Sequence, residues 1–231
     1  MEKTYCLEVI GDFACFTRPE MKVERVSYDV ITPSAARSIF EAILWKPAIA
    51  WRITKIEVLN PIRWINLRRN EVGAVASTRG GALFIEDERQ QRAGLFLRDV
   101  AYRIHAHFEL RDPTFHKANF PHLSPSRPDP GDTEGENLFS NPPAKFLAMF
   151  ERRAARGQCV NQPYLGCREF ACNFRLVENP AVGRPAIQET RDLGWMLHDL
   201  DYADPADPKP RFFRAELNNG VIDLAHVEVR G

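Results

Sequence analysis

The chain has 231 residues, of which 44% are apolar, and its 31 lysine and arginine side chains balance 31 aspartate and glutamate side chains. This length suits one large domain or a domain with a smaller second unit, and the apolar fraction is sufficient for a hydrophobic core. A zero net charge excludes binding of a polyanion through overall charge, so such a partner has to be held by local clusters of basic residues.

The cysteines and the N-terminal segment indicate a cytoplasmic protein. The chain has five cysteines, which are Cys6, Cys15, Cys159, Cys167 and Cys172. No CxxC pair occurs among them and their spacing is irregular, which argues against a disulfide framework and against a zinc site. The first ten residues lack a charged segment followed by an apolar run, and about 18 consecutive apolar residues occur nowhere. We therefore expect reduced thiols, no metal or other cofactor, and no membrane association.

The first elements are a strand and a helix. Residues 4–16 combine alternating polarity with aromatic and β-branched side chains, which predicts a strand interrupted near Gly11. Thr32 followed by Pro33 is a favourable helix start, and apolar residues recur after it with a period of about 3.6. The sequence therefore predicts a helix over residues 33–45.

Two further strands follow. The inward face of a strand at about 49–59 changes parity, which predicts a bulge near Thr54. Residues 99–110 alternate strictly, with one apolar face and one face that carries Arg103, His105, His107 and Glu109. The two histidines could bind a metal, but a third ligand at useful spacing is missing, so solvated strand positions are favoured.

The second half of the chain begins with a proline-rich segment. Residues 111–143 are too polar to bury and predict a long mobile loop. A helix is expected next, capped by Asn141, started by Pro142 and ended at Gly157. Strands are predicted at 168–175 and 193–202, and a hairpin at 211–229 around the turn Asn218-Asn219-Gly220.

The element order indicates an α+β fold. Two β-α units followed by more strands are typical of a ferredoxin-like (RRM-like) core with a β-rich C-terminal extension. We expect the core over residues 1–157, including the long loop, and the extension over residues 158–231.

Basic and aromatic residues gather near predicted strand and helix ends, where loops present side chains. Arginine pairs with phosphate and tryptophan offers a stacking surface, so this combination suits single-stranded nucleic acid. The alternative is that the tryptophans belong to the core and the arginines to a solvated rim or, at the end of a helix, complement its dipole. The RNA-binding candidates are Trp45, Lys46, Arg63, Trp64, Arg68, Arg69, Asn70, Arg152, Arg153 and Arg168.

Lys145 is the clearest candidate for chemistry. It occupies the first turn of the later helix, where the helix dipole opposes a positive charge, so its ammonium is suited to an anion or to proton transfer. The alternative is an ordinary surface lysine. His116 and His122 lie in the long loop, where a substrate could reach them.

Four stretches resemble a known family. PSAARSIFEAILWKP, NPIRWINLRRNEV, ERQQRAGLFLRDVAYRIHAHFEL and KFLAMFERRAARGQCVNQPYLGCREF are similar, in order, to signatures of the CRISPR-associated Cas five family of the RAMP superfamily, in its Dvulg or type I-C subtype. The resemblance covers residues 1 to about 230. Its LRRNEV and PYLGCREF blocks are the most specific.

The resemblance implies an RRM-like RNA-binding fold and a processing endoribonuclease. Members of the subtype cut precursor CRISPR RNA at the base of the repeat hairpin without a metal and remain on the 5′ handle. They do so in an interference complex with the Cas seven backbone and a large subunit. A non-catalytic handle-binding scaffold and a general RRM-like RNA binder are the alternatives.

The resemblance also implies where the cutting residues lie. The subtype uses a tyrosine before WKP and a lysine followed by a histidine at the start of the later helix. The corresponding residues here are Leu44, Lys145 and Phe146, of which only Lys145 is titratable. An active enzyme would combine Lys145 with a substitute base, His116 or His122.

Overall fold

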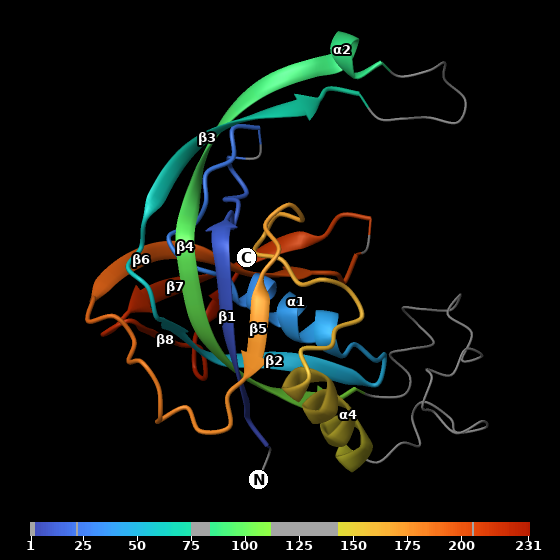
Figure 1. The fold of residues 1–231 in the computed structure, drawn as a ribbon, viewed down its shortest axis with the longest axis vertical. Coiled ribbons are helices and arrows are strands. Elements are labelled where there is room, and N and C mark those ends of the chain that lie inside the picture. Colours follow the sequence, from blue (N-terminus) through green and yellow to red (C-terminus); the bar gives the residue numbers. More distant parts are fainter. Residues whose placement is uncertain (1–2, 22, 75–83, 112–142, 205) are drawn as a thin grey trace, which may run out of the picture.

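The computed structural model describes residues 3–21, 23–74, 84–111, 143–204 and 206–231, which form a mixed α/β fold rich in sheet (Figure 1). The larger sheet contains β1 (Tyr5–Ala14), β2 (Ile49–Val58), β3 (Trp64–Val72), β4 (Arg89–Leu110), β5 (Asn173–Leu176) and β8 (Val221–Asp223). The smaller sheet contains β6 (Arg191–Asp201), β7 (Lys209–Leu217) and β9 (Val229–Arg230). The helices are α1 (Pro33–Ile43), α2 (Ile85–Glu88) and α4 (Pro143–Ala155). None of these helices is both long and apolar enough to cross a membrane.

Strand β4 organises the larger sheet. Its C-terminal half lies between β1 and β2 in the antiparallel order β5-β1-β4-β2-β8, and its N-terminal half pairs with β3. Leu97 pairs with both Ala14 and Trp64, so β3 follows β2 along the edge of β4 opposite β1. The β3–β4 hairpin therefore extends beyond α1 and α4 and carries α2 at its tip (Figure 1).

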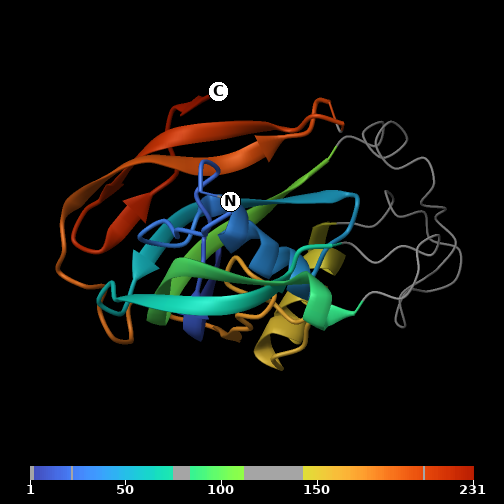
Figure 2. The same ribbon diagram turned by 90° about the horizontal axis from the view of Figure 1, so that it is seen from above.

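Helix α1 confirms the predicted start. The Thr32 hydroxyl accepts a hydrogen bond from the amide of Ala35 at 3.3 Å, and Pro33 occupies the first turn. The helix ends at Ile43, and Leu44 is already extended. Figure 2 shows α1 between the smaller sheet and α4. Ion pairing of Arg37 with Asp199 at 2.8 Å joins α1 to β6.

Strands β1 and β2 test the two predicted irregularities. The register of β2 against β4 shifts between Ile53 and Lys55, so the bulge near Thr54 is confirmed. The interruption near Gly11 is wrong, because β1 continues through Gly11, which pairs with Val100. A Cβ atom at Gly11 would lie 2.4 Å from Leu165 Cδ1, so the glycine permits close packing rather than a break.

Residues 64–72 form a strand, whereas the sequence was interpreted as presenting these side chains from loops. Alternate residues of β3, including Ile65 and Leu67, pack against the small buried cluster of Cys15, Phe96 and Cys167. The intervening side chains face solvent. This alternation is the reason that the segment pairs as a strand.

The C-terminal elements follow the prediction in part. Strand β6 is present where a strand at 193–202 was expected. The turn is also present, with positive φ angles at Asn219 and Gly220. The strand expected at 168–175 is shorter, because β5 begins only at Asn173.

The predicted hairpin is confirmed in part. Asn218 and Val221 form an isolated antiparallel bridge at the turn, and β9 pairs with Phe212 and Phe213 of β7, but β8 pairs with β2 instead of β7. The pairing of β8 with β2 buries Ile222 and attaches β8 to the larger sheet.

The predicted loop at 111–143 and the predicted helix start at Asn141 and Pro142 lie almost entirely outside the described residues. Helix α4 is described from Pro143, and Gly157 follows its end with a φ of 65°, as expected for a left-handed helix terminus.

The polar face of β4 is buried around a charged network. Arg103 Nη1 lies 2.7 Å from Glu57 Oε2, and His105 Nε2 lies 2.8 Å from Glu57 Oε1. Arg103 also donates to the carbonyls of Pro180 and Arg184, so the segment around residues 180–184 covers this face. The prediction of a solvated His105 is therefore wrong. Burial lowers the pKa of the His105 imidazole.

Replacing Arg103 will show what this network contributes to stability. Arg103→Leu leaves the buried Glu57 carboxylate with Lys55 and His105 as its remaining partners, and we expect the free energy of unfolding to fall by roughly 1–3 kcal/mol. Arg52→Leu is the matched control, because the Arg52–Glu109 pair links the same two strands on the surface and its loss costs less than about 1 kcal/mol. Urea denaturation measures both, and equal losses would contradict the interpretation.

Candidate nucleic-acid interface

Leu44 and Phe146, where the resemblance implies a tyrosine and a histidine, both lie in the core beside Trp51 and Phe108. The Leu44 carbonyl accepts a hydrogen bond from Trp51 Nε1 at 2.8 Å, and Leu44 is fully buried. Phe146 is also buried and meets Phe108 edge to face, with ring centroids 6.3 Å apart. Phe108 in turn packs on Trp51. Both side chains are therefore core residues that a bound RNA does not reach.

Lys145 has a different environment from its neighbour Phe146. It is partly exposed in the first turn of α4, where the first backbone amides of the helix lack partners within the helix. This end of α4 can therefore hold an anion. His116 and His122 lie outside the described residues, so their distance from Lys145 is not defined.

Strand β3 separates its two arginines by alternation. Arg68 is exposed, as is Asn70. Arg69 turns inward, where its guanidinium lies 5.0 Å from the centroid of the Phe96 ring and pairs with Glu71 at 2.8 Å and with Glu169. Arg68 can therefore contact a phosphate, whereas Arg69 holds the hairpin against the segment after residue 165.

The other basic candidates also divide into exposed and structural groups. Arg153 Nη1 donates to the Ile43 carbonyl at 2.9 Å and so ties α4 to the end of α1. Arg63 is exposed and lies 3.7 Å from the Asp99 carboxylate. The exposed members of the set are Trp45, Arg63, Arg68, Asn70, Arg152 and Arg168, and the partly buried members are Lys46, Trp64, Arg69 and Arg153.

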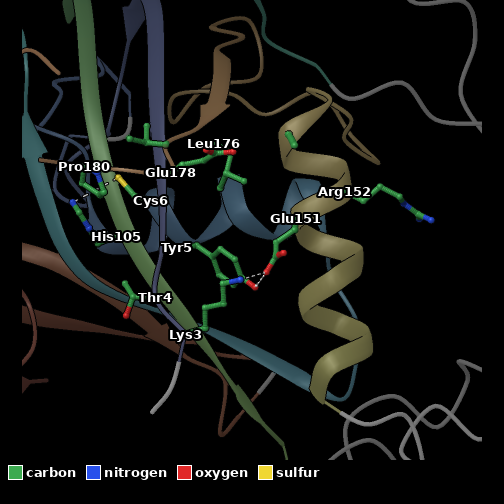
Figure 3. Close-up of a pocket in the computed structure, with 12 residues that line it drawn as sticks. Lys3, Thr4, Tyr5, Cys6, His105, Glu151, Arg152, Leu176, Glu178 and Pro180 are labelled. Carbon is green, nitrogen blue, oxygen red and sulfur yellow. Dashed lines mark hydrogen bonds and ion pairs between the residues drawn. The ribbon is translucent and has the colours of Figure 1, made fainter. Parts of the chain in front are cut away.

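A cavity of about 650 Å³ separates the start of β1 from α4 (Figure 3). The Tyr5 hydroxyl donates to Glu151 Oε1 at 2.7 Å, and Lys3 Nζ approaches the same oxygen at 2.5 Å. Burial, followed by the contact with Glu151, raises the pKa of Tyr5, so its hydroxyl remains a hydrogen-bond donor. Arg152 lines the cavity but points away from this group.

The sequence did not identify the Tyr5–Glu151 pair, because 145 residues separate its members and Tyr5 fits the apolar pattern of a strand. It also left open whether His105 and His107 bind a metal. His107 Nε2 lies 3.8 Å from Glu109 Oε1. Both residues are on β4, as is the buried His105. Within the described ranges, three or more metal-ligating side chains do not come together at any point.

The comparisons identify the family. The protein-family model described as "CRISPR-associated protein (Cas_Cas5)" matches residues 4–118 and 131–225 of this chain. The chain is 48% identical to a protein of Mannheimia succiniciproducens, over 94% of this chain and 93% of that protein. It is 42% identical to a protein of Thermus thermophilus, over 94% of this chain and 90% of that protein. Both relatives are named "CRISPR pre-crRNA endoribonuclease Cas5d".

A solved structure of a CRISPR-associated protein shares the fold, with a TM-score of 0.65 at 24% identity over 100% of this chain and 97% of the other. The resemblance seen in the motifs is thus confirmed over nearly the whole sequence. The chain belongs to the CRISPR-associated Cas5 family, in its Cas5d branch.

Proposed function

We propose that this protein is a metal-independent endoribonuclease that cuts precursor CRISPR RNA at the base of the repeat hairpin. The observation that carries this proposal is the identity of 48% and 42% to two relatives named as pre-crRNA endoribonucleases, over more than nine tenths of the chain. After cleavage the protein stays on the 5′ handle. It then works as a subunit of a type I-C interference complex, beside the Cas seven backbone and the large subunit.

We also propose that β1, α1, β2, the second half of β4, α4 and β5 form a ferredoxin-like (RRM-like) core. The strand order β5-β1-β4-β2, antiparallel throughout and served by two helices, supports this assignment. The sequence predicted a core over residues 1–157 and an extension over 158–231, whereas the core proposed here also includes β5 at residues 173–176. A cytoplasmic location is part of the proposal, and five free thiols support it.

Cleavage without a metal uses the RNA's own 2′-hydroxyl. This oxygen attacks the neighbouring phosphorus as a base removes its proton, and the 5′-oxygen leaves as an acid protonates it. The crowded phosphorane carries extra negative charge, which a nearby cation stabilises. Lys145 at the start of α4 supplies that cation. Leu44 and Phe146 carry no titratable group and are buried, so His116 or His122 supplies the base.

The second candidate function is a non-catalytic scaffold that binds the 5′ handle. Leu44 and Phe146 favour it, because apolar residues fill the core where the subtype has a tyrosine and a histidine. Arg68 and the other exposed basic residues would bind RNA in either case. The two candidates therefore differ in chemistry rather than in affinity.

Incubation of the protein with its repeat RNA in EDTA separates the two functions. We expect cleavage that leaves a 2′,3′-cyclic phosphate and that stops when a 2′-deoxynucleotide replaces the attacking hydroxyl. Lys145→Ala should slow single-turnover cleavage by about 10²-fold or more, because it removes the charge that stabilises the phosphorane. Lys209→Ala, on the smaller sheet, is the control. Tight binding of uncut RNA by the wild type would leave the scaffold as the function.

The two arginines of β3 should affect RNA binding differently. Arg68→Ala should weaken binding to repeat RNA and reduce the slope of log K against log salt concentration by about 1, since one phosphate contact is lost. Its thermal unfolding should match the wild type. Arg69→Ala should instead lower the melting temperature, because Glu71 and Glu169 lose their partner. Fluorescence anisotropy across a salt series measures the slope, and an unchanged slope for Arg68→Ala would contradict the assignment.

A further inference from the structure

Another cavity, of about 380 Å³, opens between the end of α1 and residues 160–164. Trp45 and Tyr164 supply aromatic rings to its lining, while Asn161 and Gln162 supply amides. The sequence indicated Trp45 as an RNA-binding candidate, whereas the other three residues occurred only within the QCVNQPYLGCREF stretch that carries the family resemblance. The fold alone brings them together.

The wall formed by residues 160–164 is built before any ligand arrives. The amides of Val160 and Asn161 both donate to the Ala42 carbonyl, at 2.8 and 3.4 Å, which attaches the wall to α1. The Cys172 amide donates to the Pro163 carbonyl at 3.0 Å and holds the other end. A preformed cavity avoids the entropy cost of ordering a loop on binding.

The cavity exposes large apolar side chains. Trp45 and Tyr164 are each 39% exposed and Val160 is 64% exposed. The Tyr164 backbone forms an isolated β-bridge with Ala171, so its position is fixed. Exposed aromatic rings in a rigid hollow indicate a binding site rather than a flexible surface.

The chemistry of the lining matches a nucleobase. An aromatic ring offers a stacking surface, and side-chain amides offer both a donor and an acceptor to a base edge. Gln162 donates its amide nitrogen to the Cys172 carbonyl at 2.8 Å, which directs its oxygen away as an acceptor. Ligand pockets span about 300–1,000 Å³, so a cavity of about 380 Å³ has room for one base but not for a helix or strand.

The charges close to the cavity do not oppose the binding of a nucleobase. The carboxylate of Glu41, which lines the cavity, is paired with Arg37 at 2.8 Å. The Arg153 guanidinium donates to the carbonyl of Ile43, the residue after Ala42 of the lining, so a cation lies at the end of α1.

We propose that this cavity binds a single unpaired nucleobase of the repeat RNA, stacked against Trp45 and Tyr164. The inference rests on the proposed function and adds how the RNA is held. Because stacking requires a base that has left its helix, the cavity recognises a single-stranded nucleotide next to the hairpin rather than the hairpin itself. Trp45, which lines the cavity, directly follows Leu44 at the end of α1.

The first test measures the affinity of full-length variants for uncleavable, 2′-deoxy-substituted repeat RNA. Trp45→Ala and Tyr164→Ala should each weaken binding by about 5- to 100-fold, the range expected for loss of one stacked base. Trp45→Phe should retain most of the affinity, because it keeps a stacking ring. Trp195→Ala is the control, since Trp195 is an exposed tryptophan on the smaller sheet.

The second test places one abasic nucleotide at each unpaired position of the RNA in turn. At one position, the abasic nucleotide should weaken RNA binding to the wild type but not to Trp45→Ala, since the missing base and the missing tryptophan remove the same contact. Uniform effects of every abasic site on both proteins would overturn the inference, even with cleavage intact. Unchanged RNA affinity with failed assembly onto the Cas seven subunit would overturn it in favour of a protein-docking cavity. Absence of repeat RNA binding by the wild type would overturn the proposed function as well.

Discussion

The rest of the fold depends on the pairing of β4 along its 22 residues, because three other strands take their register from it. Asp99 has a positive φ of 55° at the point where β2 gives way to β3 on the same edge. The Asn60 side chain donates to the Asp99 carbonyl at 2.6 Å and stabilises this conformation. One strand can thus serve as the centre of the packed sheet and as half of an exposed hairpin.

This arrangement separates core positions from RNA-facing positions. The packed half of β4 buries Phe108 against Phe146 and the aromatic cluster, while the hairpin half presents Arg68 on its partner strand β3 to solvent. The Ala42 carbonyl and Arg153 bring the segment after α4 to the end of α1. The proposed base-binding cavity is therefore a consequence of how the two helices pack, rather than of a local motif.

Local signals predicted the features that depend on neighbouring residues. The Thr32–Pro33 start of α1 and the bulge near Thr54 were both readable, because a cap and a parity change need only nearby positions. The partner of β8 and the burial of His105 depend on segments more than 70 residues away, which no local pattern encodes. At the site, the alternation of β3 could have separated Arg68 from Arg69. Tyr164 belongs to the family-like PYLGCREF block, but no local pattern placed its ring beside Trp45.

The burial of Leu44 and Phe146 bears on how the family's chemistry can vary. A buried apolar side chain of this size stabilises a fold by roughly 1.5–3 kcal/mol, whereas a tyrosine hydroxyl or imidazole in the same place requires a polar partner. The side chains that we propose to bind RNA, such as Arg68 and Trp45, are exposed rather than buried, although Trp45 directly follows Leu44 in the chain. Affinity and catalysis can therefore change independently in this fold. In the function that we propose, RNA binding depends on exposed side chains outside the core, while cleavage depends on Lys145 and a base from another segment.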